Sequence, residues 1–495
     1  MNRLGLGGLA ALPGPIARPD YDLGAVGIGI VHLGLGAFHR AHQAVYTDAI
    51  LPRHPRWGIC GVSLKTPRVI AALTPQDGLY SVLEKGAEGT SARVVGSVRE
   101  MLFLGTERDR VIARIADPAV HVVSLTVTEK GYCHDPATGR LDLAHPDIAH
   151  DLATPRSPVS AVGLLAAGLE ARRAAGAGPL TVVCCDNLPH NGRTVEGIVG
   201  AIVQARDPAL AEWIGVQVAF PNTMVDRIVP ATTAADVADA AARLGVADAA
   251  PVVAEPFSQW VLEDRFAGPR PPWEDAGAQF AADVAPFETM KLRLLNGSHS
   301  SLAYLGFLLG HETIWQASAD RDLASFVERQ MEEEIAPTLV APPGVDLATY
   351  RHQLMARFRN PALPHRTQQI AMDGSQKLPQ RLLGTVRDRL AGGGSIRHLA
   401  LAVAAWIRYA SGRDEAGAPI VVADPLAARF AVIAAEAGQG ADAAARLTDG
   451  FLALTAVFGA DLPAQPAFRA AVAHNVAALL RDGARRTLAA HLAGA

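Results

Sequence analysis

The sequence has few cysteines and few aromatic residues, and it carries no long run of one charge. Its 495 residues include 4 Cys, and 5% are Phe, Trp or Tyr. The cysteines are too scattered for a disulfide framework or a C-x-x-C zinc or redox pair; they are Cys60, Cys133, Cys184 and Cys185. Cys184 and Cys185 lie in an apolar run, so we expect small buried side chains. The sequence offers no convincing zinc ligand set, and we expect no metal.

Basic charge is also scarce, because 45 Lys and Arg face 49 Asp and Glu, a formal net charge of -4. A nucleic-acid-binding protein would need a basic surface, so we expect no nucleic-acid partner. The most apolar stretch, "LLNGSHSSLAYLGFLLG", contains Asn, His and Ser and is typical of a buried core helix rather than a membrane span. The N-terminal stretch has too little positive charge for a signal peptide, and a loose tail is expected. These patterns predict a soluble cytoplasmic enzyme, whose oligomeric state, monomer or dimer, stays open.

The first half of the chain alternates strand-like and helix-like segments. The predicted strands are rich in Val, Ile and Leu and cover residues 27–34, 57–64, 121–128 and 180–187, and a helix is predicted over 160–176. Near-continuous apolar strands alternating with helices indicate an α/β Rossmann-type domain with a parallel sheet covered on both faces.

The second half is different, since from about residue 284 apolar residues recur at helical spacing. We therefore predict a dinucleotide-binding Rossmann-type domain over residues 1–283 and a mostly α-helical catalytic domain over residues 284–495. The boundary follows the Pro-rich stretch "GPRPPWEDAG".

The stretch "IVHLGLGAFHRAH" resembles the opening of a dinucleotide-binding unit. Gly34 and Gly36 directly follow a predicted strand, and a helix can begin near Phe38. The first glycine of a Rossmann turn makes the turn, and the second lets the backbone approach the pyrophosphate. His39 replaces the third glycine, which serves helix–strand packing, and Arg40 can add positive charge near the phosphates. The alternative is an ordinary strand-to-helix turn.

A dinucleotide site usually has an acid at the end of the second strand, where it binds the ribose 2′-hydroxyl. Here the strand runs into "KTPR", without Asp or Glu. Lys65 and Arg68 can meet a 2′-phosphate, or they are plain surface charges. We expect NAD as cofactor, with NADP not excluded.

The stretch "ETMKLRLLNGSHS" carries the polar residues Lys291, Asn296 and His299. On an ideal helix of about 100° per residue, Lys291 and Asn296 lie about 140° apart, unless Gly297 relaxes the helix. Hydride transfer to or from an alcohol needs a base for the hydroxyl proton and donors for the oxygen, which Lys and Asn can supply. The alternative is a solvated Lys and a core His.

A further Asn comes from "CDNLPHNG", where Asn187 ends a predicted strand. Ligands of open α/β sheets bind at the carboxyl ends of strands, so we expect Asn187 to face Lys291 and Asn296 in a cleft between the two domains. The alternative is that this stretch is only a turn cluster.

Seven stretches together resemble the long-chain, zinc-independent polyol dehydrogenases, also called the mannitol dehydrogenase family. They are "IVHLGLGAFHRAHQA", "SLTVTEKGYC", "CDNLPHNG", "FPNTMVDRIVP", "EPFSQWVLED", "MKLRLLNGSHS" and "MDGSQKLPQRL". The resemblance implies a Rossmann domain followed by a helical domain. It implies Lys291 as general acid/base, Asn187 and Asn296 as oxyanion donors, His299 as a substrate-orienting residue, Glu288 as a carboxylate on the proton path, Asp226 and Lys377 in the substrate pocket, and Gly34, Gly36, Phe38 and Arg40 at the cofactor.

Within the family, several stretches are more similar to the fructuronate reductase (mannonate oxidoreductase) branch, and "CDNLPHNG" to mannitol 2-dehydrogenase. A sugar acid needs a cationic partner, which Arg366 or Lys377 can supply. Arg366 can equally be a structural ion-pair member. We therefore expect a keto-sugar acid as substrate, with mannitol and fructose as the alternative. A non-catalytic dinucleotide-binding protein is the remaining possibility, and the Lys-Asn-Asn set argues against it.

Overall fold

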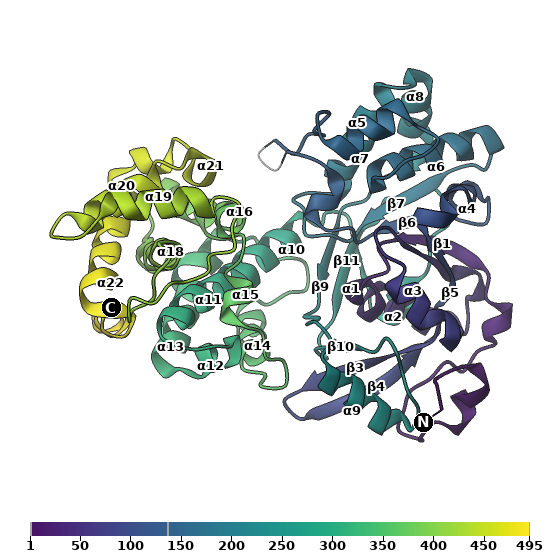
Figure 1. The fold of residues 1–495 in the computed structure, drawn as a ribbon, viewed down its shortest axis with the longest axis horizontal. Helices are drawn as coiled ribbons and strands as arrows, with labels where there is room; N and C mark the ends of the chain where they lie inside the picture. The colour runs from purple at the N-terminus through teal and green to yellow at the C-terminus, as the bar shows by residue number, and fades with distance from the viewer. Residues whose placement is uncertain (1, 136–137, 495) are drawn as a thin grey trace. The chain divides into compact units, whose positions relative to one another are not determined.

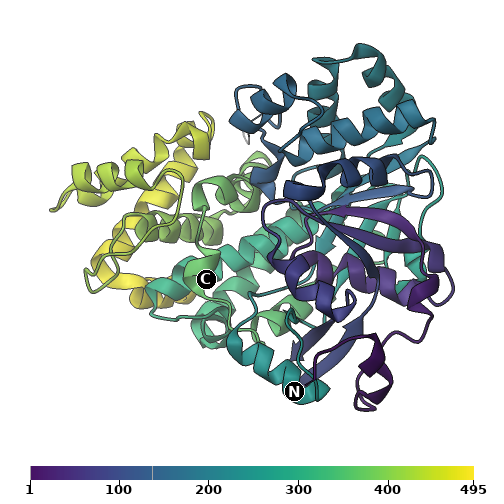
Figure 2. The same cartoon turned by 45° about the vertical axis from the view of Figure 1, so that its right-hand side comes forward.

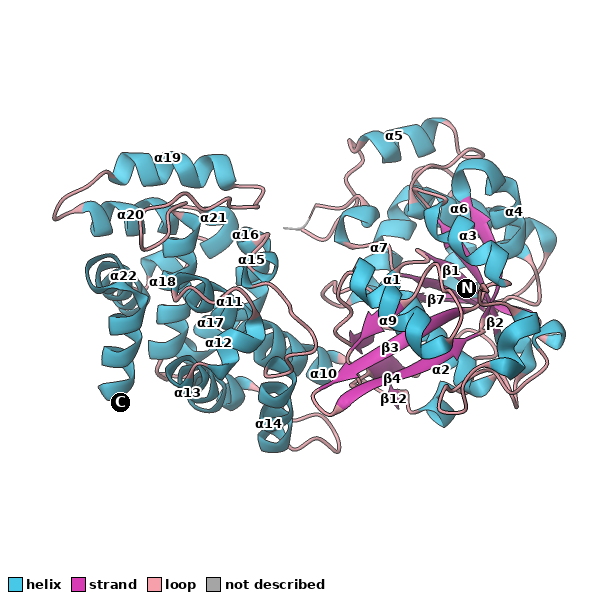
Figure 3. Cartoon of the chain, turned by 60° about the horizontal axis from the view of Figure 1, so that its bottom comes forward, coloured by secondary structure: helices cyan, strands magenta, loops and turns pink. Residues whose placement is uncertain are grey.

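The computed structural model describes residues 2–135 and 138–494, which divide into two compact units, Met1–Ala285 and Pro286–Ala495. Every strand of the described residues belongs to the first unit, and the second is helical (Figure 3). This confirms the predicted fold class, a Rossmann-type α/β domain followed by an α-helical one.

The first unit is built on a six-stranded sheet of order β5-β2-β1-β6-β7-β8, in which all neighbours are parallel (Figure 1). Its strands are β1 (Ile28–Leu33), β2 (Gly58–Ser63), β5 (Val98–Phe103), β6 (Val122–Leu125), β7 (Leu180–Cys184) and β8 (Val218–Ala219). Four of them lie within the predicted strands. The central strands are apolar on both faces, and helices cover both.

Alternate residues of β1 enter two different cores. Val31 and Leu33 pack with α4 (Leu104–Ala116), α6 (Ala161–Ala175) and α7 (Asn191–Gln204). Ile30 packs on the other face with α1 (Ala37–Ala41) and α2 (Gln43–Ile50). Figure 2 shows this layered arrangement of the first unit from a second side. Cys184 and Cys185 enter opposite cores, which confirms that they are small buried side chains.

Two three-stranded sheets in the first unit have no counterpart in the sequence prediction. One has the order β10-β3-β4, with β3 (Tyr80–Gly86), β4 (Gly89–Val95) and β10 (Val252–Ala254). The other has the order β12-β11-β9, with β9 (Thr223–Asp226), β11 (Gln259–Glu263) and β12 (Gln279–Ala281). The remaining helices of this unit are α3 (Arg68–Leu73), α5 (Pro146–Ala153), α8 (Pro208–Gln217) and α9 (Ala234–Leu244).

The second unit packs around α18 (Arg397–Ala410), in which every residue from His398 to Ala410 is buried. Helices α11 (Ser298–Leu308) and α22 (Pro466–Ala493) lie against it. The predicted core helix corresponds to α11, in which Phe307 alone is not buried. Among the described residues, no helix combines the length and the apolar character that a membrane crossing requires.

The other helices of the second unit follow the predicted helical spacing. They are α10 (Ala285–Met290), α12 (Ile314–Ala319), α13 (Arg321–Arg329), α14 (Leu347–Phe358), α15 (Thr367–Ile370), α16 (Gly374–Leu378), α17 (Gly384–Ala391), α19 (Ala427–Ala437), α20 (Ala443–Leu452) and α21 (Thr455–Phe458). Three further segments are π-helical: Lys291–Gly297, Gln330–Ile335 and Pro379–Leu383.

Candidate active site

The turn after β1 depends on Gly34, whose backbone φ is 104°. A Cβ atom here would lie 2.2 Å from the carbonyl oxygen of Thr126, so both the conformation and the space require glycine. Gly36 is extended instead, with φ −88° and ψ −178°. Among the described residues, the nearest atom to a Cβ at Gly36 would be 3.8 Å away. The backbone at Gly36 is therefore open to a ligand, as at the second glycine of a Rossmann turn.

His39, at the position of the missing third glycine, is fully buried. Its ring stacks on that of His32 in β1, with centroids 3.4 Å apart. Burial, followed by the nearby charges of His32 and Arg40, holds the pKa of His39 well below its usual value, so the ring is neutral. His39 therefore packs α1 against β1, the role of the third glycine in other Rossmann folds. Gly34 and Gly36 have the backbone geometry of the first two glycines.

A cavity of about 530 Å³ opens over this turn, within the usual range of ligand pockets. Its lining combines the glycine turn, the end of β2 and the start of α3: Gly34, Leu35, Gly36, Arg40, Ser63, Leu64, Thr66, Arg68, Val69 and Ala72, with Thr126, Thr232, Val237 and Ala249–Pro251. The open backbone at Gly36 and the neighbouring Arg40 guanidinium fit a dinucleotide pyrophosphate. The residues present therefore suit the nicotinamide cofactor that the sequence predicts.

Arg40 and Phe38 lie on α1, directly after the turn. The Arg40 guanidinium donates a hydrogen bond to the carbonyl oxygen of Ala250, and its carbon lies 5.3 Å from the ring centroid of Tyr80. These contacts hold Arg40 in the wall of the cavity. Phe38 is half-buried and stacks on His42, with centroids 5.0 Å apart, so it supports α1.

The loop after β7 is organised by Asp186, a residue that the sequence prediction missed. Its carboxylate accepts hydrogen bonds from the backbone N–H groups of Val127 and Thr128 and from the Tyr132 hydroxyl. Burial raises the pKa of Asp186 to about 6. Two stretches that the sequence singled out separately, "SLTVTEKGYC" and "CDNLPHNG", are thereby joined at the carboxyl ends of β6 and β7.

Asn191 joins this loop to the strand that carries Asp226. Its amide nitrogen donates to the carbonyl oxygens of Cys184 and Thr223, and its oxygen accepts from the Thr223 backbone N–H. Asn187 is exposed on the loop between these fixed points. Asp226 is the last residue of β9 and is buried. The stretch "CDNLPHNG" thus forms a turn held by hydrogen bonds, and Asn187 is exposed within that turn.

In the second unit, Lys291 and Asn296 lie on the π-helical segment Lys291–Gly297. In a π-helix the backbone bonds join residues i and i+5, the separation of Lys291 and Asn296. The wider turn brings these two positions closer to one face than the 140° of an ideal α-helix, and thus corrects the α-helical geometry expected from the sequence. Lys291 is buried, with 8% of its surface exposed.

Gly297 allows the π-helical segment to lie close to another segment of the second unit. A Cβ at Gly297 would lie 2.8 Å from the carbonyl oxygen of Arg381, so the segment packs closely against the π-helical segment Pro379–Leu383. Ser300 and Ser301 donate hydrogen bonds to the carbonyl oxygens of Asn296 and Gly297. These two side-chain bonds cap carbonyl groups at the end of the π-helical segment.

His299 is the second residue of α11 and is buried, and its Nε2 has no hydrogen-bond partner among the described residues. Its ring lies 5.3 Å from that of Phe358 and 6.1 Å from that of His365. Burial, then the nearby charges of His365, Arg381, Arg357 and Lys377, holds the pKa of His299 well below its usual value. His299 is therefore a neutral, buried ring beside a group of basic side chains.

The remaining predicted residues are spread over the second unit. Glu288 lies on α10, half-buried. Lys377 lies on α16, and its Nζ donates a 2.6 Å hydrogen bond to the carbonyl oxygen of Met372. Arg366 is exposed before α15 and lines a separate cavity of about 370 Å³. Glu312 and Asp414 line the same cavity, so the surroundings of Arg366 are partly acidic.

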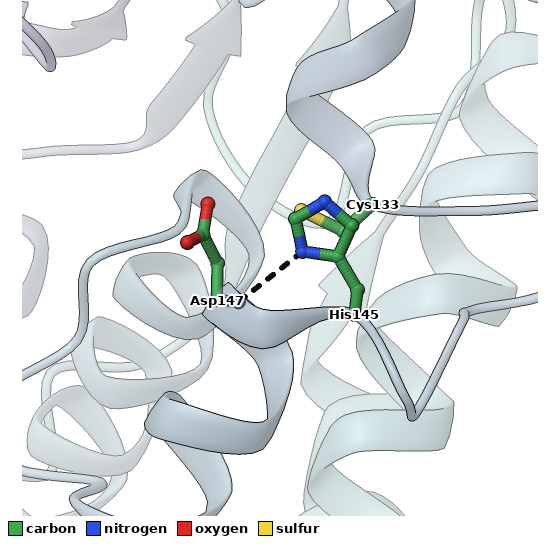
Figure 4. Close-up of side chains that lie close together, drawn as sticks. All are labelled: Cys133, His145 and Asp147. Carbon is green, nitrogen blue, oxygen red and sulfur yellow. Dashed lines mark hydrogen bonds between the residues drawn. The ribbon is translucent and has the colours of Figure 1, made fainter.

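Among the described residues, one group has side chains of the types and proximity that bind metals: Cys133, His145 and Asp147 (Figure 4). Its members have roles without a metal, since His145 caps α5 by accepting the Asp147 backbone N–H and Asp147 is an acid in the first turn. Burial raises the pKa of Cys133 to about 11, which keeps the thiol protonated. His145 and Asp147 thus have structural roles at the start of α5, and Cys133 lies beside them.

Comparison with known proteins places both units in one family. Residues 28–275 match the mannitol dehydrogenase Rossmann domain, and residues 283–480 match the mannitol dehydrogenase C-terminal domain. The chain is 49% identical over 481 residues to D-mannonate oxidoreductase of Escherichia coli K12, covering 96% of this chain and 98% of that protein. It is 41% identical over 481 residues to mannitol 2-dehydrogenase of Phaeosphaeria nodorum, covering 96% of this chain and 83% of that protein.

A solved structure shows the same similarity along the whole length. Mannitol 2-dehydrogenase of Pseudomonas fluorescens, in a ternary complex with NAD and D-mannitol, matches with a TM-score of 0.89 and 38% identity and covers 100% of both chains. With two family domains in order and relatives matched almost end to end, the chain belongs to the mannitol dehydrogenase family.

Proposed function

We propose that the protein is an NAD-dependent oxidoreductase that reduces a keto-sugar acid, fructuronate, to mannonate, and catalyses the reverse oxidation. The glycine turn and its cavity support a nicotinamide cofactor, and the solved relative contains NAD. The relative at 49% identity is named for D-mannonate, which supports the substrate. When bound, NAD supplies the hydride acceptor, and NADH the donor.

In the proposed mechanism, Lys291 handles the proton of the reacting hydroxyl group. During oxidation, the neutral Nζ takes the hydroxyl proton while the carbon–hydrogen bond breaks and the carbonyl forms. During reduction, Lys291 returns that proton to the new alkoxide. Asn187 and Asn296 donate hydrogen bonds to the reacting oxygen, where negative charge develops. Glu288, three residues before Lys291, relays the proton towards solvent, and His299 orients the substrate.

The observation that carries the sugar-acid assignment is the group of basic residues around His299. Arg357, Arg381 and Lys377 are near enough for their charges to act on its ring, with His365 beside them. A substrate carboxylate is stabilised by such cations, whereas a neutral polyol gains little from them. Lys377 is the member of this group that the family resemblance assigned to the substrate pocket, with Arg366 as the other predicted carboxylate partner. Asp226 is proposed to bind substrate hydroxyl groups.

Mannitol 2-dehydrogenase is the second candidate function, because the solved relative that matches the whole chain binds D-mannitol. Oxidation of NADH, followed by its absorbance, distinguishes the two when fructuronate and fructose are compared at equal concentration. We expect kcat/KM for fructuronate to exceed that for fructose by about a hundredfold, a difference that one charged contact and its unpaired counterpart can produce. A higher value for fructose would reject the sugar-acid assignment and support the second candidate.

A further inference from the structure

The cofactor cavity contains no acid at the place where an NAD-specific Rossmann site has one. The position is occupied by Ser63, the last residue of β2, and residues 61–73 include neither Asp nor Glu. Among the described residues that line the cavity, the charged ones are Arg40 and Arg68, both positive. An acid at this position binds the ribose 2′-hydroxyl and repels a 2′-phosphate, so the cavity lacks the element that rejects NADP.

Arg68 is the cation that remains available to a ligand. It is exposed at the start of α3, and its side chain makes no hydrogen bond or ion pair with another residue that the structure describes. Arg40, by contrast, is fixed by its bond to Ala250 and its stacking on Tyr80. Lys65 is exposed as well but is not part of the cavity wall. Of the two basic residues that follow β2, only Arg68 therefore lines the cavity.

Two polar groups on this side of the first unit form hydrogen bonds within the protein. The Ser63 hydroxyl donates a 2.6 Å hydrogen bond to the carbonyl oxygen of Thr66, which fixes the turn between β2 and α3. The buried acid on this side, Asp248, accepts hydrogen bonds from Ser81, Gln76 and Ala250 and is not part of the wall. The Asp248 carboxylate is thus bound by protein donors and does not face the cavity.

We propose that this end of the cavity binds the 2′-phosphate of NADP(H) through Arg68, so that the enzyme uses NADP(H) as well as NAD(H). This inference rests on the proposed function, because it requires that the cavity over the glycine turn binds a nicotinamide dinucleotide.

The test measures dissociation constants directly, by titrating the protein with NADH and NADPH in a calorimeter and by nicotinamide fluorescence. We expect the dissociation constants for NADH and NADPH to agree within about tenfold, because tenfold is roughly what one charge-assisted contact contributes. Arg68→Gln should weaken NADPH binding by roughly tenfold and change NADH binding by less than about twofold. Ser63→Asp, which places an acid at the strand end, should weaken NADPH binding in the same way and preserve NADH binding.

Lys65→Gln is the matched control, since it removes an exposed basic residue of the same segment that does not line the cavity; it should change neither constant. Adenosine 2′,5′-bisphosphate and adenosine 5′-monophosphate provide the same comparison without the nicotinamide. If the protein bound NADH but not NADPH, or if Arg68→Gln weakened the binding of both equally, the proposed 2′-phosphate site would be wrong. The proposed function would not be affected. Failure to bind either dinucleotide would overturn both.

Discussion

At the scale of single residues, substitutions of the two glycines in the turn after β1 should have different effects, one on stability and the other on NADH binding. Gly34→Ala should lower the free energy of unfolding by about 2 kcal/mol or more, because the new Cβ meets Thr126 and φ is positive. Gly36→Ala should leave stability within about 0.5 kcal/mol and weaken NADH binding by about tenfold, because its Cβ enters space meant for the ligand. Urea unfolding and NADH titration of both variants check this. Equal stability loss in both would contradict it.

Lys291 tests the proposed chemistry. Lys291→Ala should lower kcat by roughly 10²–10⁴-fold, as expected for loss of a general base, with NADH affinity unchanged. Methylamine added to this variant should restore part of the activity, because it can occupy the vacated space and carry the proton. Lys291→Met keeps the side-chain volume and serves as the control, which methylamine should not rescue. Full activity in Lys291→Ala would show that another group is the base.

The two predicted carboxylate partners can be compared with each other. Lys377→Gln should raise KM for fructuronate by roughly tenfold and KM for fructose much less, because a carboxylate loses a charged contact. Arg366→Gln should have the smaller effect, since Glu312 and Asp414 share its cavity. Steady-state kinetics with both sugars check this. If Arg366→Gln had the larger sugar-acid effect, carboxylate recognition would belong to the exposed loop before α15.

Residue types at short spacing could be predicted, and long-range partners could not. Gly34 and Gly36 follow an apolar strand within three residues, so sequence alone indicates their turn. Asp186 gave no such signal, because its partners Val127, Thr128 and Tyr132 are more than fifty positions away. The roles of Asn187, Asn296, Glu288 and Lys291 stay predictions that the kinetic experiments must test.

At the scale of helices and strands, the π-helical segment Lys291–Gly297 sets the relation between Lys291 and Asn296. Gly297→Ala should separate this segment from Pro379–Leu383 by a few tenths of an ångström or more, because its Cβ would meet the Arg381 carbonyl oxygen. We expect kcat to fall by roughly tenfold to a hundredfold, the cost of misplacing catalytic groups, with NADH affinity unchanged.

Gly384→Ala is the control for this prediction. It directly follows the partner segment, and the nearest atoms to its Cβ would be 3.8 Å away, so kcat should be nearly unchanged. Circular dichroism would show whether Gly297→Ala retains its helical content. Wild-type kcat in Gly297→Ala would mean that the close packing of the two π-helical segments does not position the catalytic residues.

The main strands and the long helices could be predicted, because their apolar spacing is local. The sheets β10-β3-β4 and β12-β11-β9 could not, since β3 pairs with β10 across a sequence separation of about 170 residues, and β9, β10 and β12 have only three or four residues each. The π-helix also escaped prediction, and so did its close packing at Gly297 against Arg381, because helical periodicity does not reveal contacts between positions so far apart in the sequence.

At the scale of the whole molecule, buried neutral histidines predict loss of stability in acid. Burial lowers the pKa of His32 to about 3, of His365 to about 4 and of His491 to about 3. The unfolded chain binds these protons near pH 6.5, so stability is present above that pH and is lost as pH falls towards 4. Burial raises the pKa of Asp186 to about 6 and also raises the pKa of Asp48 and Glu334, which gives these three carboxyl groups the opposite dependence. His39 and His299, whose pKa values burial lowers, act in the same direction as the three histidines above.

Thermal unfolding at pH 7.5 and pH 5.0 checks this sign, and the melting temperature should be lower at pH 5.0. His491 shares a 2.9 Å hydrogen bond with His398, which is distant in the sequence. His491→Gln should therefore reduce the difference between the melting temperatures at the two pH values. A melting temperature that rises on acidification would show that carboxylates such as Asp186 dominate the titration.

The four buried cysteines have a practical consequence for spectroscopy. All lie in Met1–Ala285, each is free, and burial raises the pKa of each thiol, so maleimide dyes should react with none of them in the native protein. The segment Pro286–Ala495 contains no cysteine at all. A single surface cysteine introduced there would accept one fluorophore or spin label in the otherwise wild-type chain, and ligand-induced motion could be followed without first removing any native thiol.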